Sequence, residues 1–149
     1  LPGGLERYEI VSQKGIPLVI APGCVDMTNF WARETVPEKY DNRRFYQWAE
    51  NITLMRTTPE ENAEIGRNLA AKANMSSGPV AFFLPLRGVS MMDAPNKEFW
   101  WPEANQALFD AIKDNVKSSI PVYELDCNIN DDEFADAIAN KMLEFLKTP

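Results

Sequence analysis

Short apolar runs alternate along the chain with longer stretches in which apolar residues recur at helical spacing. The runs over residues 17–21, 52–55, 80–84 and 121–125 predict buried strands. The helical pattern predicts helices from Leu5 toward Gly15, from Pro59 to about residue 76, over residues 103–116, and after Asn130. Strands that alternate with amphipathic helices indicate one α/β domain over residues 1–149, with a mostly parallel sheet that helices cover on both faces.

The run from Val80 to Leu84 has the composition of a central strand, and a polar loop follows it up to Pro95. In open α/β sheets, ligands bind at the edge where the carboxyl ends of the strands lie. If all four predicted strands are parallel, the four loops that follow them share that edge. These are residues 22–30, 56–58, 85–95 and 126–130.

Polar side chains in these loops are candidates to bind a small anionic or nucleotide-like ligand. Arg56-Thr57-Thr58 leads into a helix, whose first amides and dipole favour an anion, and Arg56 and Arg87 are the expected counter-charges. Thr58 is also a good helix cap, and the partner of Arg87 is either the ligand or an internal carboxylate such as Asp93 or Asp126. The candidate ligand-binding residues are Arg56, Thr57, Thr58, Arg87, Gly88, Ser90, Asn29 and Asn128.

The chain contains no histidine, which excludes Ser-His-Asp and Cys-His nucleophile pairs and the usual imidazole metal sites. Its two cysteines do not have the number or spacing of a structural zinc site, so no metal is expected. An enzyme of the hydrolase or lyase type is nevertheless an alternative to a binding domain. It would use Asp26, Asp93 or Asp126 as general base beside the arginines, or Cys24 as a nucleophile on a sharp turn.

Residues 31–51 show neither helical nor strand periodicity, and they are rich in aromatic and basic side chains. A connection of this length is usually functional or packs against something. A third hypothesis is therefore an interaction module, in which the segment from Trp31 to Trp48 mediates homo-oligomerisation or contacts a partner domain. A lid over the ligand site is another interpretation of the same segment.

The net charge of −7 argues against non-specific nucleic-acid binding, which needs clustered lysine and arginine. No apolar run approaches the roughly 20 residues of a membrane span, and no signal-peptide pattern opens the chain. We therefore expect a cytoplasmic protein that binds neither nucleic acid nor membrane.

Six motifs, taken in order, resemble the carboxyl-terminal domain of the Tm-1-like ATP-binding family, which includes a tobamovirus-resistance protein and bacterial and fungal homologues. They are PGCVDMTNF, VPEKY, TLMRTTPEEN, LPLRGVSMMDAP, FWWPEANQALFDAI and ELDCNINDDEFADA. The resemblance implies a Rossmann-like fold within a larger two-domain parent, with early βα units and the amino-terminal domain absent from this chain. It also implies that any ATP site of the parent lies on the amino-terminal domain, so that the cofactor of the present residues is unknown.

Overall fold

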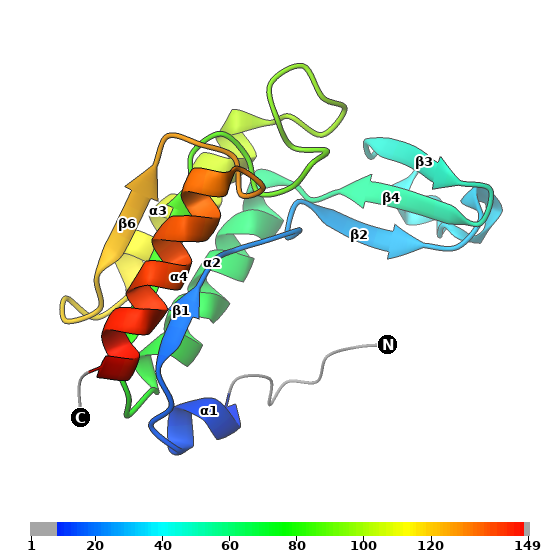
Figure 1. Ribbon diagram of the computed structural model, residues 1–149. Coiled ribbons are helices and arrows are strands. Elements are labelled where there is room, and N and C mark those ends of the chain that lie inside the picture. Colours follow the sequence, from blue (N-terminus) through cyan, green and yellow to red (C-terminus); the bar gives the residue numbers. More distant parts are fainter. Residues whose placement is uncertain (1–8, 148–149) are drawn as a thin grey trace.

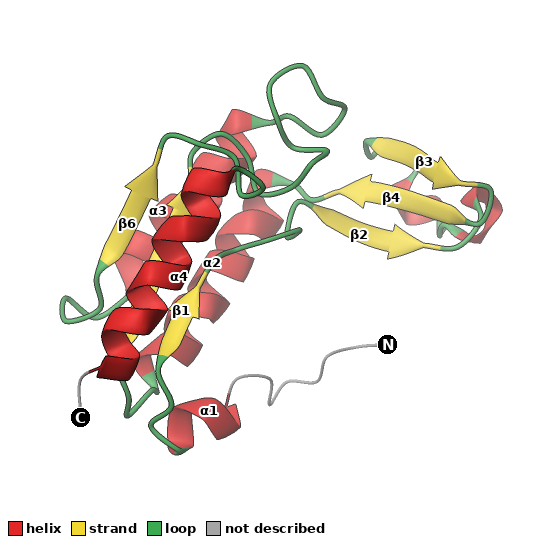
Figure 2. Cartoon of the chain, in the orientation of Figure 1, coloured by secondary structure: helices red, strands yellow, loops and turns green. Residues whose placement is uncertain are grey.

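The computed structural model describes residues 9–147 and contains the expected parallel sheet (Figure 1). Its strands are β1 (Leu18–Ile20), β5 (Val80–Pro85) and β6 (Val122–Leu125), in the order β1-β5-β6. Both pairings are parallel, with Leu18 opposite Val80 and Phe82 opposite Val122. Helices α2 (Pro59–Asn74) and α3 (Pro102–Asn115) lie on one face, and α4 (Asp132–Lys147) lies on the other (Figure 2).

Strand β5 is buried along its whole length and supplies side chains to both cores. Phe82 and Leu84 pack beneath α2 and α3, whereas Ala81 and Phe83 pack against α4. Helices α2 and α3 approach closely at Gly66, where an added Cβ would lie 2.6 Å from the carbonyl oxygen of Leu108. A continuous apolar strand between two helical layers is what a parallel sheet requires.

Two helix starts test the capping signals of the sequence. Thr58 caps α2 in a capping box with Glu61, and Pro59 occupies the first turn, which confirms the predicted start. Helix α4 was predicted to follow Asn130 directly, but it begins one residue later, after Asp131, whose carbonyl accepts the amide of Ala135. The short helix α1 (Glu9–Gln13) covers part of the first predicted helix, and the earlier part, residues 5–8, lies outside the described residues.

The prediction that residues 52–55 belong to the parallel sheet is wrong. They form β4 (Ile52–Arg56), the middle strand of a separate antiparallel sheet with the order β2-β4-β3. Its other strands are β2 (Met27–Phe30), which we expected to be loop, and β3 (Phe45–Ala49). This sheet and its connections, residues 27–56, form a β-arm that extends away from the α/β body (Figure 1).

The β-arm has two different faces. Phe30, Phe45 and Met55 lie on the outer face, which residues 31–44 cover through two 3-10 turns, η1 (Arg33–Thr35) and η2 (Glu38–Tyr40). The inner face carries Asn29 and Leu54, and near the body it packs against Met92 and Phe99. Strand β4 is therefore buried on both faces, like a parallel strand, which is why its apolar run misled the prediction.

Among residues 9–147, no helix combines the length and the apolar character needed to cross a membrane.

Candidate functional site

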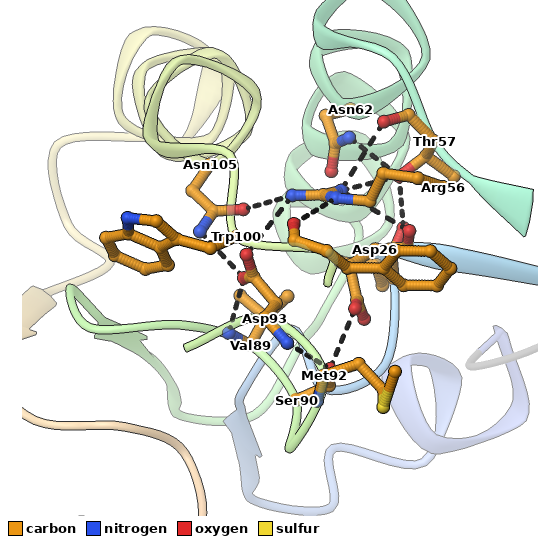
Figure 3. A network of polar contacts seen from close by, with 12 residues as sticks. Asp26, Arg56, Thr57, Asn62, Val89, Ser90, Met92, Asp93, Trp100 and Asn105 are labelled. Atoms are coloured by element: carbon orange, nitrogen blue, oxygen red, sulfur yellow. Dashed lines mark hydrogen bonds and ion pairs between the residues drawn. The ribbon is translucent and has the colours of Figure 1, made fainter. Parts of the chain in front are cut away.

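Three of the four loops expected at the carboxyl edge converge where the β-arm joins the body (Figure 3). Asp26 follows β1, Arg56 ends β4, and Ser90 and Asp93 follow β5. Helix α3 adds Asn105 from the side. The predicted neighbourhood of these residues is correct, although Arg56 reaches it from an antiparallel strand.

The side chain of Arg56 is fully buried, and each guanidinium nitrogen has a protein acceptor. Nε donates to the carbonyl of Phe99 at 2.8 Å, and Nη1 donates to Thr57 Oγ1 at 3.0 Å. Nη2 donates to Asn105 Oδ1 at 3.0 Å and pairs with Asp93 Oδ1 at 3.3 Å. Arg56 thus links the β-arm to the body and presents no free cation to solvent.

The two buried carboxylates of this network are bound differently. Asp93 Oδ2 accepts the amide of Val89 at 3.0 Å and Asn105 Nδ2 at 2.7 Å. Among the described residues, the Asp26 carboxylate accepts only the Ser90 hydroxyl, at 2.7 Å through Oδ2, and its Oδ1 has no partner. Burial raises the pKa of Asp26, and the charge of Asp93 adds to this effect. Its environment therefore favours the protonated acid.

The hydroxyl groups predicted to bind a ligand have internal roles. Ser90 Oγ accepts the amides of Met92 and Asp93, at 3.0 and 3.1 Å. Thr57 Oγ1 donates to the carbonyl of Val25 at 3.0 Å, and the Thr58 hydroxyl caps α2. These contacts fix the loops after β1 and β5 to the end of the β-arm.

A second polar group lies where β5 and β6 end. Arg87 forms an exposed ion pair with Asp126, with Nε 2.8 Å from Oδ1, so an internal carboxylate is its partner. Asn128 Nδ2 donates to the carbonyls of Arg87 and Ser90, both at 3.1 Å. Gly88 has φ +121°, and a Cβ there would lie 1.5 Å from the carbonyl oxygen of Asp93. Gly88 and Asn128 therefore determine the shape of the loop that carries Arg87.

A pocket of about 300 Å³ lies between the loops after β1 and β5 and the inner face of the β-arm. Its lining is mainly apolar and consists of Cys24, Met27, Asn29, Trp48, Ile52, Leu54, Ser90, Met91 and Met92. Three of the predicted site residues, Cys24, Asn29 and Ser90, are therefore brought together here. Burial, and then the charge of Asp26, raises the pKa of the Cys24 thiol, which disfavours the nucleophilic thiolate.

Sequence reasoning missed two buried asparagines that complete the network. Asn62 Nδ2 donates to Thr57 Oγ1 at 2.8 Å, and Asn105 bridges Arg56 and Asp93. Both occupy buried positions on the faces of α2 and α3. A polar residue on an apolar helical stripe was the available signal, because a buried amide needs hydrogen-bond partners.

These features define a three-layer α/β domain with an antiparallel β-arm and a pocket at the carboxyl edge of its parallel sheet. The chain belongs to the UPF0261 family: residues 1–146 match the Uncharacterised protein family (UPF0261) C-terminal domain. This agrees with the resemblance found in the sequence motifs.

The chain is similar to proteins from bacteria and a plant. A UPF0261 protein of Clostridium tetani is 44% identical over 148 residues, which are 99% of this chain and 37% of that protein. A UPF0261 protein of Rhizobium meliloti is 45% identical over 139 residues, covering 92% of this chain and 35% of that protein. The ToMV resistance protein Tm-1(GCR237) of Solanum lycopersicum is 37% identical over 142 residues, covering 93% of this chain and 19% of that protein. The chain thus spans about a third of the bacterial relatives' length.

Proposed function

We propose that this domain binds a small anionic or nucleotide-like ligand at the carboxyl edge of the parallel sheet, in the pocket between the β5 loop and the β-arm. The position of the pocket carries the proposal. Open α/β sheets bind ligands at this edge, and a volume of about 300 Å³ is at the lower end of the range of ligand pockets.

The lining favours a flat, partly apolar group such as a nucleobase. Trp48, Ile52 and Leu54 offer apolar contact, and the exposed Asn29 amide can donate and accept hydrogen bonds. A mainly apolar pocket with a few polar groups is the usual composition of a small-molecule site. The size suits one ring system rather than an entire dinucleotide.

Arg87 is the side chain that we assign to the anionic part of the ligand. It lies three residues before Ser90 on the same loop, is 57% exposed, and uses Nε and Nη2 to bind Asp126. An anion would compete with, or bind beside, that carboxylate. Arg56 is excluded from this role because it is buried and fully bonded.

Binding is favoured over acid-base catalysis by the candidate carboxylates. The ion pair with Arg87 lowers the pKa of Asp126, which makes that exposed group a weak base. Asp26 has a raised pKa but is fully buried, and Asp93 is buried in its pair with Arg56. A catalytic base needs both access to the substrate and a suitable pKa, and none of the three candidates combines them.

A binding screen with matched variants tests the proposal. The intact protein is screened by thermal shift against nucleotides, phosphorylated metabolites and small carboxylates, because a ligand at 100 times its Kd adds about 2.7 kcal/mol of stability. Met91→Ala should weaken a hit about tenfold, since its side chain lines the pocket. Met75→Ala is the control, because Met75 is equally exposed (60% against 59%) but lies outside the pocket.

Arg87→Ala separates the anionic from the apolar contacts. It should weaken anionic ligands and leave uncharged analogues unaffected. A screen without hits, or hits that are equally insensitive to Met91→Ala and Arg87→Ala, would contradict the proposal.

A further inference from the structure

We infer that two copies of this chain associate through the inner face of the β-arm, with Trp31 and Trp48 at the contact. Trp31 is 74% exposed and Trp48 is 49% exposed. Ile52 lines a hollow with each of the two tryptophans, and Met91 lines one with Trp48; Ile52 is 37% exposed and Met91 is 59% exposed. Exposed apolar side chains are normal when they are scattered, but a contiguous group of them indicates a contact surface.

The inner face is uncovered along the half of the β-arm that lies farther from the α/β body. The outer face is covered by residues 31–44, in which Val36 is buried. On the inner face, Met92 and Phe99 cover Leu54 near the body, but the cover ends before Ile52. A second hollow of about 320 Å³, lined by Asn29, Phe30, Trp31, Asn51 and Ile52, adjoins the first pocket through Asn29 and Ile52.

Charge favours a second copy as the occupant of this face. The chain carries a net charge of −7, so two copies repel each other over most of their surfaces. The inner face is an exception, because none of the residues that line its two hollows is charged. Two copies of this face can therefore meet without repulsion between like charges, whereas a strongly charged partner would find no opposite charge here.

The exposed area is also adequate for a twofold contact. The four side chains expose on the order of 500 Å² per copy, so an isologous contact that buries this surface twice reaches about 1,000 Å², the lower limit for a specific interface. Tryptophan and methionine are enriched at such contacts. The β-arm that carries this surface extends away from the α/β body (Figure 1).

Sedimentation equilibrium of the full-length protein with Trp31→Glu tests the inference. Trp31 does not line the first pocket, so the variant leaves the side chains of the proposed ligand site unchanged. We expect a wild-type dimer whose Kd rises at least about 100-fold in the variant, as for an interface hot spot. Leu146→Glu is the matched control, because Leu146 is 64% exposed on α4, away from the β-arm, and should leave the Kd unchanged.

Hydrogen exchange of the wild-type protein supplies a measurement that does not depend on a variant. Raising the concentration through the dimer Kd should protect amides of residues 27–31 and 45–52. A wild-type protein that is monomeric at 100 times the usual assay concentration would overturn the inference. So would a Kd equally affected by both variants or by neither, or protection confined to residues outside the β-arm.

Discussion

Replacing Arg56 by methionine is the most direct test of the buried network. Methionine keeps most of the side-chain length but removes the cation that pairs with Asp93 at 3.3 Å. It also leaves the Phe99 carbonyl, which Arg56 Nε contacts at 2.8 Å, and Asn105 Oδ1 without this donor. Because both members of the ion pair are fully buried, water cannot replace the lost contacts without a change in structure.

The expected loss is about 3 to 5 kcal/mol in the free energy of unfolding, the usual effect of leaving one buried charge without its partner. That is a large share of the 5 to 15 kcal/mol of a typical domain. The Asp93 carboxylate keeps the Val89 amide and the Asn105 amide group, so it is not stripped of all contacts. Because these hydrogen bonds remain, we expect the variant to be less stable but still folded.

Urea unfolding of the intact protein, followed by tryptophan fluorescence, measures the change. Arg67→Met is the matched control, since Arg67 forms an exposed pair with Glu64 and should change stability by less than about 0.5 kcal/mol. In a double-mutant cycle, Asp93→Asn should cost less in the Arg56→Met background, with a coupling of about 1 to 3 kcal/mol. A loss below about 1 kcal/mol for Arg56→Met, or zero coupling, would refute the structural role of this pair.

Two further substitutions test individual positions of the same region. Burial raises the pKa of Asp26, so the folded state binds this proton more tightly, and its contribution to stability falls as pH rises from about 4 through the raised pKa. The Asp26→Asn variant should therefore become more stable relative to the wild type as the pH rises through this range, as measured by urea unfolding. A stability difference that does not depend on pH would contradict the raised pKa of Asp26. Gly88→Ala should lose more than about 3 kcal/mol, because of the positive φ and the 1.5 Å approach to Asp93. Gly23→Ala, which meets only the flexible end of Ile129 at 3.1 Å, should lose less than about 1 kcal/mol, and equal losses would argue against the loop geometry.

The parallel part of the fold could be predicted because local signals and tertiary structure agree there. The apolar run of β5 lies between two helical layers, and the capping box at Thr58 starts α2 where it was expected. These features depend on periodicity and on neighbours within a few residues. Sequence reasoning resolves such features well.

The β-arm could not be predicted, because its structure depends on contacts between distant segments. Strand β4 has an apolar run like a buried parallel strand, but its second face is covered by residues 31–44. The pairing of β2 with β4 also needs a register across more than 20 residues, for example Met27 with Arg56. No short turn specifies that register, so local patterns left residues 27–30 as loop.

The sequence predicted which residues lie close together at the site, but it did not predict which partners their side chains bind. Asp26, Arg56 and Ser90 meet as expected, and the side chains of Arg56 and Ser90, which were predicted to bind a ligand, are buried and bonded to protein groups. Sequence shows that a polar residue ends a strand, but not whether its partner is internal. Here the side-chain oxygen of the buried Asn105 accepts a hydrogen bond from Arg56, and Asn105 lies on a helix 49 residues farther along the chain.

Ser90 connects the buried network to the proposed binding pocket. Its hydroxyl binds Asp26 and orients the amides of Met92 and Asp93, while the same residue lines the pocket beside Met91. The shape of the pocket is therefore set by bonds made on its buried side, because side chains locked by a second layer of contacts hold a site in place. The Arg56–Asp93 pair lies in that layer and also fixes the base of the β-arm, whose inner face forms the opposite wall. One network thus positions both walls of the pocket, which explains why so many buried polar groups are concentrated at this edge of the sheet.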